Sequence, residues 1–256
     1  MFRVVIPARY DSVRLPGKAL RQIGGKPMVQ WVHERARAAG ALEVLIATDD
    51  ARIMDAARGF GAEAVMTSAA HLSGTDRIAE VAAARRWPES DIVVNLQGDE
   101  PLMPAALIAQ VAAVLDSVPA AHIATLAAPL SSVAELLDTN AVKVVTDTSG
   151  RALYFSRAPI PWNRAGAGAD LASQTDAGGA RRHLGIYAYR VGALRRLAAL
   201  APGALELREK LEQLRALENA FHIQVADARE APGPDVNTAA DLARVAALLG
   251  AGTAEG

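Results

Sequence analysis

Three cations follow the first apolar run of the chain at short intervals. Arg9, Arg14 and Lys18 come after residues 2–6, a run that a proline ends and that is typical of a buried strand. Arginine offers forked donors to phosphate oxygens and lysine a compact point charge, and Gly17 lets the backbone approach a ligand closely. The pattern therefore indicates a triphosphate site, with a solvated basic loop as the competing interpretation.

A second motif, Gln97-Gly98-Asp99-Glu100-Pro101, follows the strong strand candidate at residues 92–96. Ligands of α/β sheets bind outside the carboxyl ends of the strands, so Asp99 should lie at the same sheet edge as the cationic loop. Mg²⁺ takes one or two protein carboxylates and completes its shell with phosphate oxygens and water. We therefore predict that Asp99 holds Mg²⁺ beside a nucleoside triphosphate. A simple turn, in which Gly and Asp are common, is the alternative.

The elements that must position these residues alternate between strand and helix through the first half of the chain. Further strands are predicted at residues 44–47 and 64–66, and helices at residues 27–39, 51–60, 76–86 and 104–116. This rhythm predicts an α/β fold with a mostly parallel sheet and helices on both faces. The glycine fingerprints of dinucleotide-binding folds and of P-loops do not occur.

The pattern changes after residue 122, where the connections shorten. Strands are expected at residues 123–126, 141–145, 153–155, 183–189 and 222–226, and helices at 191–200, 207–219 and 239–249. The Gly-, Ala- and Asp-rich stretch at 163–176 predicts a mobile loop, and the tail 250–256 is expected to fray. We expect one domain over residues 1–256, with a smaller antiparallel lobe inserted at roughly residues 140–215.

Composition excludes several classes of protein. Hydrophobic residues make up 51% of the chain and charged residues 21%, and the formal net charge is −1. This balance is that of a globular protein without the basic field of nucleic-acid binders. The absence of cysteine excludes disulfides and thiolate sites and fits a reducing cytoplasm. No apolar run is long enough for a membrane span or a signal peptide, so we expect a cytoplasmic protein without a membrane or nucleic-acid partner.

Motifs along nearly the whole chain resemble those of the 3-deoxy-manno-octulosonate (Kdo) cytidylyltransferases. The matching stretches lie at residues 7–18, 71–77, 97–101, 140–145, 154–161, 182–187 and 211–215. The first motif is shared with other sugar cytidylyltransferases. The strings Ser156-Arg157-Ala158-Pro159-Ile160-Pro161 and His183-Leu184-Gly185-Ile186-Tyr187 are more particular to the Kdo enzymes.

The resemblance implies a fold, a reaction and a setting. The fold would be a Rossmann-like nucleotidyltransferase sheet, whose smaller lobe serves sugar binding and dimerisation. In the implied reaction, the anomeric hydroxyl of Kdo attacks the α-phosphorus of CTP to give CMP-Kdo and pyrophosphate, with Mg²⁺ as cofactor. A homodimer that works in the cytoplasm in lipopolysaccharide assembly is expected. Two anionic substrates must meet, so charge neutralisation and in-line positioning would carry most of the catalysis.

The resemblance also implies roles for individual residues. Arg9, Lys18 and Asp99 would be catalytic. The nucleotide would contact Ala8, Arg9, Arg14, Lys18, Ser73, Gly74 and Arg77. The sugar acid would contact Gln97, Arg157, His183, Tyr187, Glu212 and Gln213. Each sugar assignment has a structural alternative: a surface cation at Arg157, a partner for a backbone carbonyl at His183, and solvated helix positions at Glu212 and Gln213.

One departure from the family pattern concerns the metal. The family usually reads Gly-Val-Asp-Thr near the C-terminus, with its Asp as a second metal ligand, whereas this chain has Asn237 there. An amide oxygen still binds Mg²⁺ but carries no charge. We therefore predict Asp99 and Asn237 as metal ligands, with Asp235 as a substitute, because residues i and i+2 share a face of an extended segment.

Two other functions stay open at this point. The first is a cytidylyltransferase for another acidic sugar, such as a sialic acid, against which the Kdo-type strings argue. The second is a protein that binds CTP with weak or no turnover, suggested by Asn237 in place of an aspartate. Pyrophosphate release distinguishes both from the main hypothesis.

Overall fold

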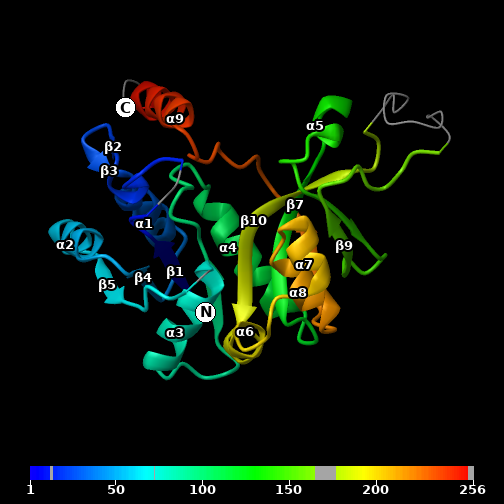
Figure 1. The fold of residues 1–256 in the computed structure, drawn as a ribbon, viewed down its shortest axis with the longest axis horizontal. Coiled ribbons are helices and arrows are strands. Elements are labelled where there is room, and N and C mark those ends of the chain that lie inside the picture. The colour runs from blue at the N-terminus through cyan, green and yellow to red at the C-terminus, as the bar shows by residue number, and fades with distance from the viewer. Residues whose placement is uncertain (12–13, 72, 165–176, 253–256) are drawn as a thin grey trace.

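The computed structural model describes residues 1–11, 14–71, 73–164 and 177–252. Within these residues a nine-stranded sheet forms the centre of the molecule, and its main path runs β11-β7-β10-β6-β1-β4-β5 (Figure 1). The strands on this path are β1 (Phe2–Ala8), β4 (Glu43–Thr48), β5 (Glu63–Met66), β6 (Ile92–Asn95), β7 (Ile123–Pro129), β10 (Arg181–Arg190) and β11 (Ile223–Asp227). Neighbours pair in parallel except β10, which runs antiparallel to β6 and β7. The predicted mostly parallel α/β sheet is confirmed.

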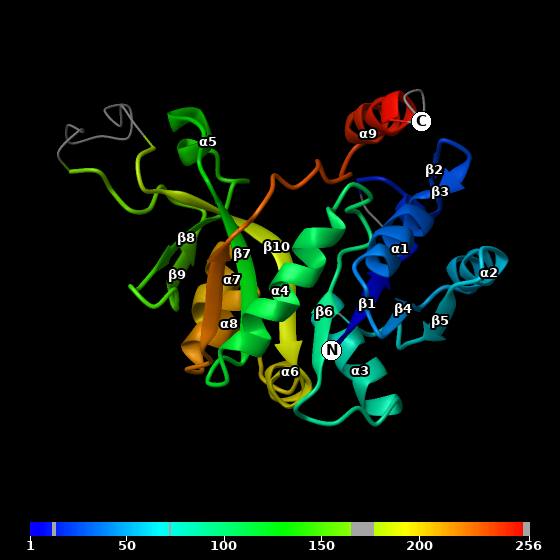
Figure 2. The same ribbon diagram turned by 180° about the vertical axis from the view of Figure 1, so that it is seen from behind.

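Helices cover both faces of this sheet (Figures 1 and 2). On one face lie α1 (Met28–Ala38), α2 (Ala51–Gly59) and α4 (Ala105–Ser117); on the other lie α3 (Gly74–Ala84), α6 (Val191–Ala198) and α8 (Gln213–Glu218). Because side chains alternate across a strand, β1 sends Val4 and Ile6 into the first core and Val5 into the second. The centre of the strand, residues 4–6, is therefore apolar and buried on both faces, as the sequence pattern required.

The antiparallel strands of the second half are continuous with the central sheet. The hairpin of β8 (Lys143–Thr146) and β9 (Ala152–Ser156) joins the sheet where β8 pairs with Arg181 and Arg182 of β10. The expected lobe is thus attached through β10, whose other end lies between β6 and β7. The boundaries at roughly residues 140 and 215 stay a prediction.

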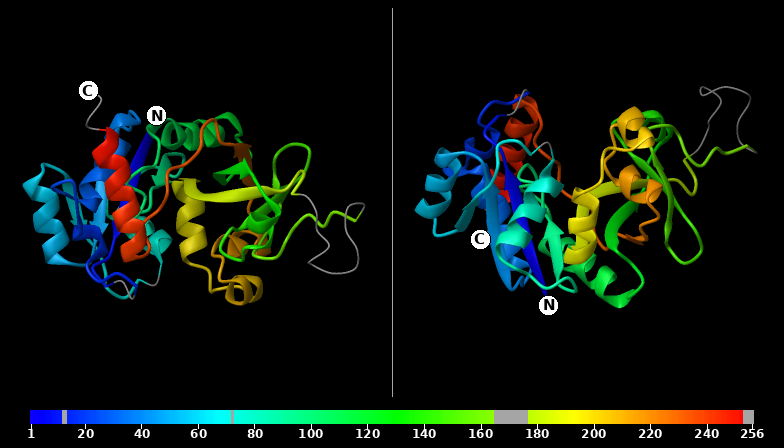
Figure 3. Two further views of the ribbon diagram at one scale, coloured as in Figure 1. Left: turned by 90° about the horizontal axis from the view of Figure 1, so that it is seen from above. Right: turned by 60° about the horizontal axis from the view of Figure 1, so that its bottom comes forward.

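A third, smaller core fixes the C-terminal helix α9 (Ala239–Gly252) over the start of the chain (Figure 3). Val236 and Val245 pack there with Leu15, which belongs to the cationic loop, and with Ile23 and Met28. The two strands β2 (Gln22–Ile23) and β3 (Lys26–Pro27) form a small separate sheet beneath α9. The C-terminal segment is therefore held beside the predicted triphosphate loop.

Several elements differ from the sequence-based expectations. The predicted helix at 207–219 is two helices, α7 (Ala204–Glu209) and α8, because Lys210 adopts a left-handed conformation with φ of 54°. The short helices η1 (Lys18–Leu20) and α5 (Val133–Leu137) were not expected, and α9 continues to Gly252 where fraying was predicted. The expected mobile loop falls mostly on residues 165–176, which lie outside the described residues. No described helix combines the length and apolar character needed to cross a membrane.

Candidate active site

The predicted phosphate loop and Asp99 lie at the point where the strand order reverses. β1 has β4 on one side and β6 on the other, and ligands of open α/β sheets bind at such a position. The loop leaves β1 and the Gln97–Asp99 segment leaves β6 at the same edge. A Cβ on Gly98 would lie 2.9 Å from the carbonyl oxygen of Pro7, so the absence of a side chain lets the two strand ends come this close.

Charged and amide side chains from three distant parts of the chain meet at this edge. The ammonium of Lys18 lies 2.6 Å from Oδ2 of Asp99 and 3.3 Å from Oδ1 of Asn237. Arg14 donates to the same amide oxygen at 2.9 Å. The N–H of Val236 donates to the carbonyl oxygen of Asp99 at 2.9 Å, which holds the C-terminal segment against the end of β6. The structure thus brings together four residues that the sequence analysis named for phosphate and metal binding.

The cationic loop is held in shape by contacts that sequence reasoning missed. Gly17 has φ of 65°, and its N–H donates to the carbonyl oxygen of Tyr10 at 3.1 Å. The guanidinium of Arg52 lies 3.2 Å from the centre of the Tyr10 ring, while Arg52 also pairs with Asp50, the residue that caps α2. A cation stacked on an aromatic ring therefore links the loop to α2. A Tyr and an Arg far apart in the sequence gave no signal for this contact.

One cavity of about 150 Å³ lies directly over this loop. It is lined by Pro7, Ala8, Arg9, Asp11, Lys18, Ala19, Met28, Gln97, Gly98 and Asp99. The predicted nucleotide residues Ala8, Arg9 and Lys18 therefore share one cavity with the predicted metal ligand Asp99. Arg14 does not line this cavity, but it donates to the same oxygen of Asn237 as Lys18, which does. This is the arrangement that a triphosphate with a divalent cation requires.

A larger cavity of about 740 Å³ adjoins the first, since Gln97 and Asp99 line both. Four more of the predicted sugar-binding residues lie around it: His183, Tyr187, Glu212 and Gln213. Its wall also contains residues that the sequence analysis did not assign to a ligand, among them Asn140, Arg182 and Glu100. Two anionic molecules placed in these cavities would meet at Gln97 and Asp99.

Glu212 is half-buried near the start of α8 and faces a further small cavity of about 70 Å³ with Thr75, Tyr187 and Tyr189. Burial raises the pKa of its carboxyl group, against the smaller opposing effect of a hydrogen bond with Thr75. Its Oε1 atom has no hydrogen-bond partner among the described residues. A buried acceptor without a partner is rare in folded proteins, and here it lies where a ligand hydroxyl could donate to it.

His183 is both a core residue and a wall of the larger cavity. Its Nε2 lies 2.9 Å from Oγ1 of Thr125, and its ring packs edge-on against Phe155 with centroids 5.0 Å apart. Burial lowers the pKa of His183 to about 3, so the imidazole is neutral at physiological pH. The neutral ring can form a hydrogen bond with a ligand but supplies no positive charge.

The three remaining nucleotide candidates lie at the start of α3. Ser73 forms a capping box with Asp76, and Gly74 lines the small cavity. Arg77 is fully buried, with Nη2 2.7 Å from Oδ2 of Asp49 and Nη1 bonded to Oγ1 of Thr67. Arg77 is not among the wall residues of the cavities described above, so its predicted contact with the nucleotide stays a prediction.

Arg157 is the one predicted sugar-binding residue that the structure places apart from the others. Its guanidinium donates to the carbonyl oxygens of Glu209 at 2.7 Å and Thr139 at 2.8 Å. The carbonyl of Glu209 is at the end of α7, where helix carbonyls lack intrahelical partners. In this structure Arg157 therefore joins α7 to the segment before β8 and lies outside the walls of these cavities.

One acidic residue of the larger cavity, Glu100, was not assigned a ligand from the sequence. Glu100 lines the larger cavity beside Asp99, and its Oε2 atom has no hydrogen-bond partner in the described part of the chain. Burial, with the charges of Asp99 and Asp235, raises the pKa of Glu100 to about 8. Its place in the Gly-Asp-Glu-Pro string next to the metal candidate was the signal that could have identified it.

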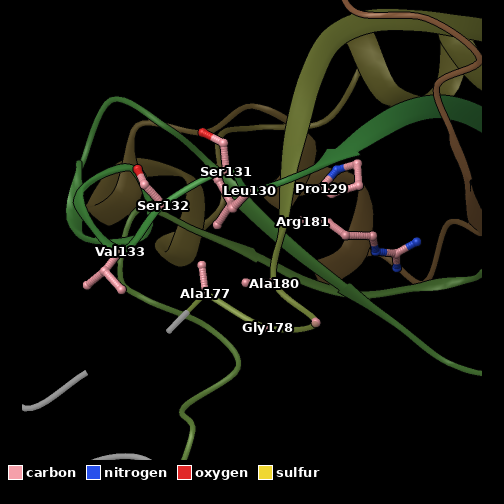
Figure 4. A pocket seen from close by; sticks show the side chains of 10 residues that line it. Pro129, Leu130, Ser131, Ser132, Val133, Ala177, Gly178, Ala180 and Arg181 are labelled. Atoms are coloured by element: carbon pink, nitrogen blue, oxygen red, sulfur yellow. The ribbon is translucent and has the colours of Figure 1, made fainter. Parts of the chain in front are cut away.

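Another cavity, of about 490 Å³, lies at the end of β7 and the start of β10, between residues 129–133 and residues 177–181 (Figure 4). The residues labelled in Figure 4 are mostly small or apolar, and Arg181 lies at one side of the cavity. None of the predicted catalytic, nucleotide-binding or sugar-binding residues lines it. We therefore place the site at the ends of β1 and β6.

Comparison with known sequences identifies the family of this chain. The family model for cytidylyltransferases matches residues 3–224. A 3-deoxy-manno-octulosonate cytidylyltransferase of Thioalkalivibrio sulfidiphilus is 56% identical over 248 residues, covering 97% of this chain and 98% of the relative. One from Pseudomonas fluorescens is 54% identical with the same coverage.

Solved structures give the same result. A structure of CMP:2-keto-3-deoxy-manno-octonic acid synthetase complexed with CTP superposes with a TM-score of 0.88 at 42% identity, covering 98% of this chain and 99% of that one. A cytidylyltransferase from Leptospira borgpetersenii, at 16% identity and a TM-score of 0.62, shares the fold. With motifs, fold and full-length relatives in agreement, this chain belongs to the 3-deoxy-manno-octulosonate cytidylyltransferase family.

Proposed function

We propose that this chain transfers CMP from CTP to the anomeric hydroxyl of Kdo, with release of pyrophosphate. The observation that carries the proposal is the junction of two cavities at Gln97 and Asp99, one lined by Arg9 and Lys18 and the other by Glu212 and Gln213. The first suits a triphosphate and the second a polyhydroxylated acid. A sialic acid as acceptor and a protein without turnover are less favoured, since the full-length relatives are named for Kdo.

In this proposal the residues of the chain act mainly by position and charge. Arg9 and Lys18 would hold the phosphate oxygens and neutralise the negative charge that grows on them as the bond to pyrophosphate breaks. Gln97, common to both cavities, would orient the sugar hydroxyl toward the α-phosphorus, so that attack is in line. Glu212 would accept hydrogen bonds from sugar hydroxyls through its unpartnered oxygen.

The donor set at this edge also fits Mg²⁺. Asp99 and Asp235 supply carboxylates, Asn237 an amide oxygen and Glu100 a buried oxygen without a partner among the described residues, and these are the hard oxygen ligands that Mg²⁺ prefers. Asp99 would hold the ion together with an oxygen from residues 235–237. When bound, Mg²⁺ would neutralise charge on the phosphates during the transfer.

The setting of the enzyme is part of the same proposal. A CMP-activated sugar acid is a donor for glycosyl transfer, so the chain would act in lipopolysaccharide assembly, in the cytoplasm where CTP is made. We expect a homodimer without nucleic-acid or membrane partners. The near-neutral net charge of −1 supports the absence of a nucleic-acid partner.

The direct test is pyrophosphate release from CTP and Mg²⁺ with Kdo, with a sialic acid, or without a sugar. We expect release with Kdo alone. Release with the sialic acid alone would keep the nucleotide site but overturn the acceptor, and binding of CTP without release under any condition would support the protein without turnover.

Glu212→Gln separates the role of this residue in the site from its role in the fold. The loss of a charged acceptor for a sugar hydroxyl should raise the KM for Kdo about tenfold or more, with the KM for CTP nearly unchanged. Since burial raises the pKa of Glu212 in the folded state, the ionised carboxylate costs stability above that pKa. The variant should therefore have a higher Tm at neutral pH. An unchanged KM for Kdo, measured by initial rates, would contradict the assignment.

A further inference from the structure

Asp235 and Asn237 project into the site from one short extended segment. The buried Val236 between them packs with Leu15 and donates its N–H to the carbonyl oxygen of Asp99. Alternate residues of an extended segment share a face, so both neighbours of Val236 line the larger cavity together with Asp99. The two side chains nevertheless meet different partners.

The amide of Asn237 is oriented by three contacts. Its oxygen accepts from Arg14 at 2.9 Å and from Lys18 at 3.3 Å, and its nitrogen donates to Oδ2 of Asp235. An oxygen that already accepts from two cationic donors is poorly placed to bind a third cation. Asn237 thus connects the two cations of the phosphate loop to a carboxylate.

Asp235 differs from Asn237 in its contacts with charged side chains. Its carboxylate is exposed and accepts from Asn237, and no Lys, Arg or His of the described chain lies within ion-pair distance of it. Asp99, by contrast, is paired with Lys18. Asp99, Glu100 and Asp235 line the same cavity, and of these three only Asp99 forms an ion pair with another described residue. Negative charge therefore remains on the side of the site where Asp235 lies.

We propose that Asp235, rather than Asn237, is the second protein ligand of Mg²⁺ beside Asp99, and that Asn237 positions Arg14 and Lys18 for the triphosphate. This inference rests on the proposed function, since CTP must supply the remaining ligands. Mg²⁺ typically takes one or two carboxylates and completes its shell with phosphate oxygens and water.

If Asp235 binds Mg²⁺, the effect of its carboxylate on CTP affinity should change sign when the ion is present. A carboxylate that does not bind the ion would show no such change of sign. Without a divalent cation, the Asp235 carboxylate repels the triphosphate; with Mg²⁺ bound, it attracts the Mg²⁺–CTP complex. Asp235→Asn should therefore bind CTP more tightly than the wild type in EDTA and more weakly in saturating Mg²⁺. The gain in CTP affinity that Mg²⁺ provides should fall about tenfold or more, within the usual range of coupling between two ligands.

The measurement is isothermal titration of CTP into the full chain, without sugar, in EDTA and in Mg²⁺. Asn237→Ala should weaken CTP binding in both buffers and leave the Mg²⁺-dependent gain within about twofold, because it loosens Arg14 and Lys18 alike. Asp116→Asn is the matched charge control, because it removes one exposed carboxylate at the far end of α4. It should change neither the affinity for CTP nor the gain in affinity that Mg²⁺ provides.

Two results would overturn the proposal: an unchanged Mg²⁺-dependent gain in Asp235→Asn, or loss of that gain in Asn237→Ala. Asp235 is exposed, so its substitution should leave the fold intact, and circular dichroism verifies this. Pyrophosphate release by the same wild-type preparation tests the proposed function separately. Wild-type turnover combined with an unchanged gain in Asp235→Asn would refute the ligand assignment alone.

Discussion

Replacing Lys18 with Ala should lower kcat/KM for CTP about 10²–10³-fold, the usual cost of removing one preorganised donor from a developing negative charge. The ammonium lies in the cavity over the phosphate loop, 2.6 Å from Asp99, and its side chain is 15% exposed. In water-poor surroundings a fixed positive charge acts more strongly than in bulk solvent. The loss should appear in pyrophosphate release at saturating Kdo.

Lys26→Ala is the matched control for this experiment. Lys26 pairs with Glu34 at the surface, where each side chain is 39% exposed, and exposed pairs of this kind contribute little to stability. The control should retain wild-type kinetics. If Lys18→Ala also retained kcat/KM within about threefold, the developing charge would have to be stabilised elsewhere, and the assignment of the loop would be wrong.

Replacing Arg77 with Met should destabilise the fold by about 3–5 kcal/mol, the range for removing one partner of a buried ion pair. The guanidinium is fully buried and bonded to Asp49 and Thr67, and the side chain of Asp49 is only 17% exposed. The variant would leave that carboxylate short of its partner. In a chain of this size we expect a fall in Tm of about 10 °C, measured by thermal unfolding.

The controls separate the loss of charge from the loss of packing. Arg58→Met removes an arginine whose pair with Asp55 is largely exposed, and it should change stability by less than about 0.5 kcal/mol. The double variant Arg77→Met with Asp49→Asn should recover part of the loss, because it no longer leaves a charge unpaired. A Tm for Arg77→Met equal to that of the wild type would show that the buried pair does not stabilise the fold.

Much of the fold was predictable because parallel strands buried on both faces are apolar at every position. Residues 92–96 and 44–47 therefore stood out, and β6 and β4 lie there. The break between α7 and α8 was not predictable, since the leucine pattern continues across Lys210 and only the backbone of that residue departs from a helix. Nor did any local pattern indicate that β10 lies antiparallel between β6 and β7.

The residues of the site were likewise predictable only in part. Asp99 and Lys18 were identified because charged residues in the segments that follow buried strands meet at one edge of a sheet. For Arg157 and Arg77 the residue type alone does not say what the guanidinium contacts. In the structure the first binds the carbonyl oxygens of Glu209 and Thr139, and the second binds Asp49 and Thr67. Their predicted contacts with substrate remain predictions.

The sequence by itself determined the class of fold, the family and the loop chemistry, because these depend on local patterns of burial and on short motifs. The tertiary structure alone decided which distant groups share a contact. Lys18 meets Asp99 across 81 positions of the chain and Asn237 across 219. Such contacts follow from the strand order and from the packing of α9 and Val236 over the loop, which are long-range features that no stretch of sequence encodes alone.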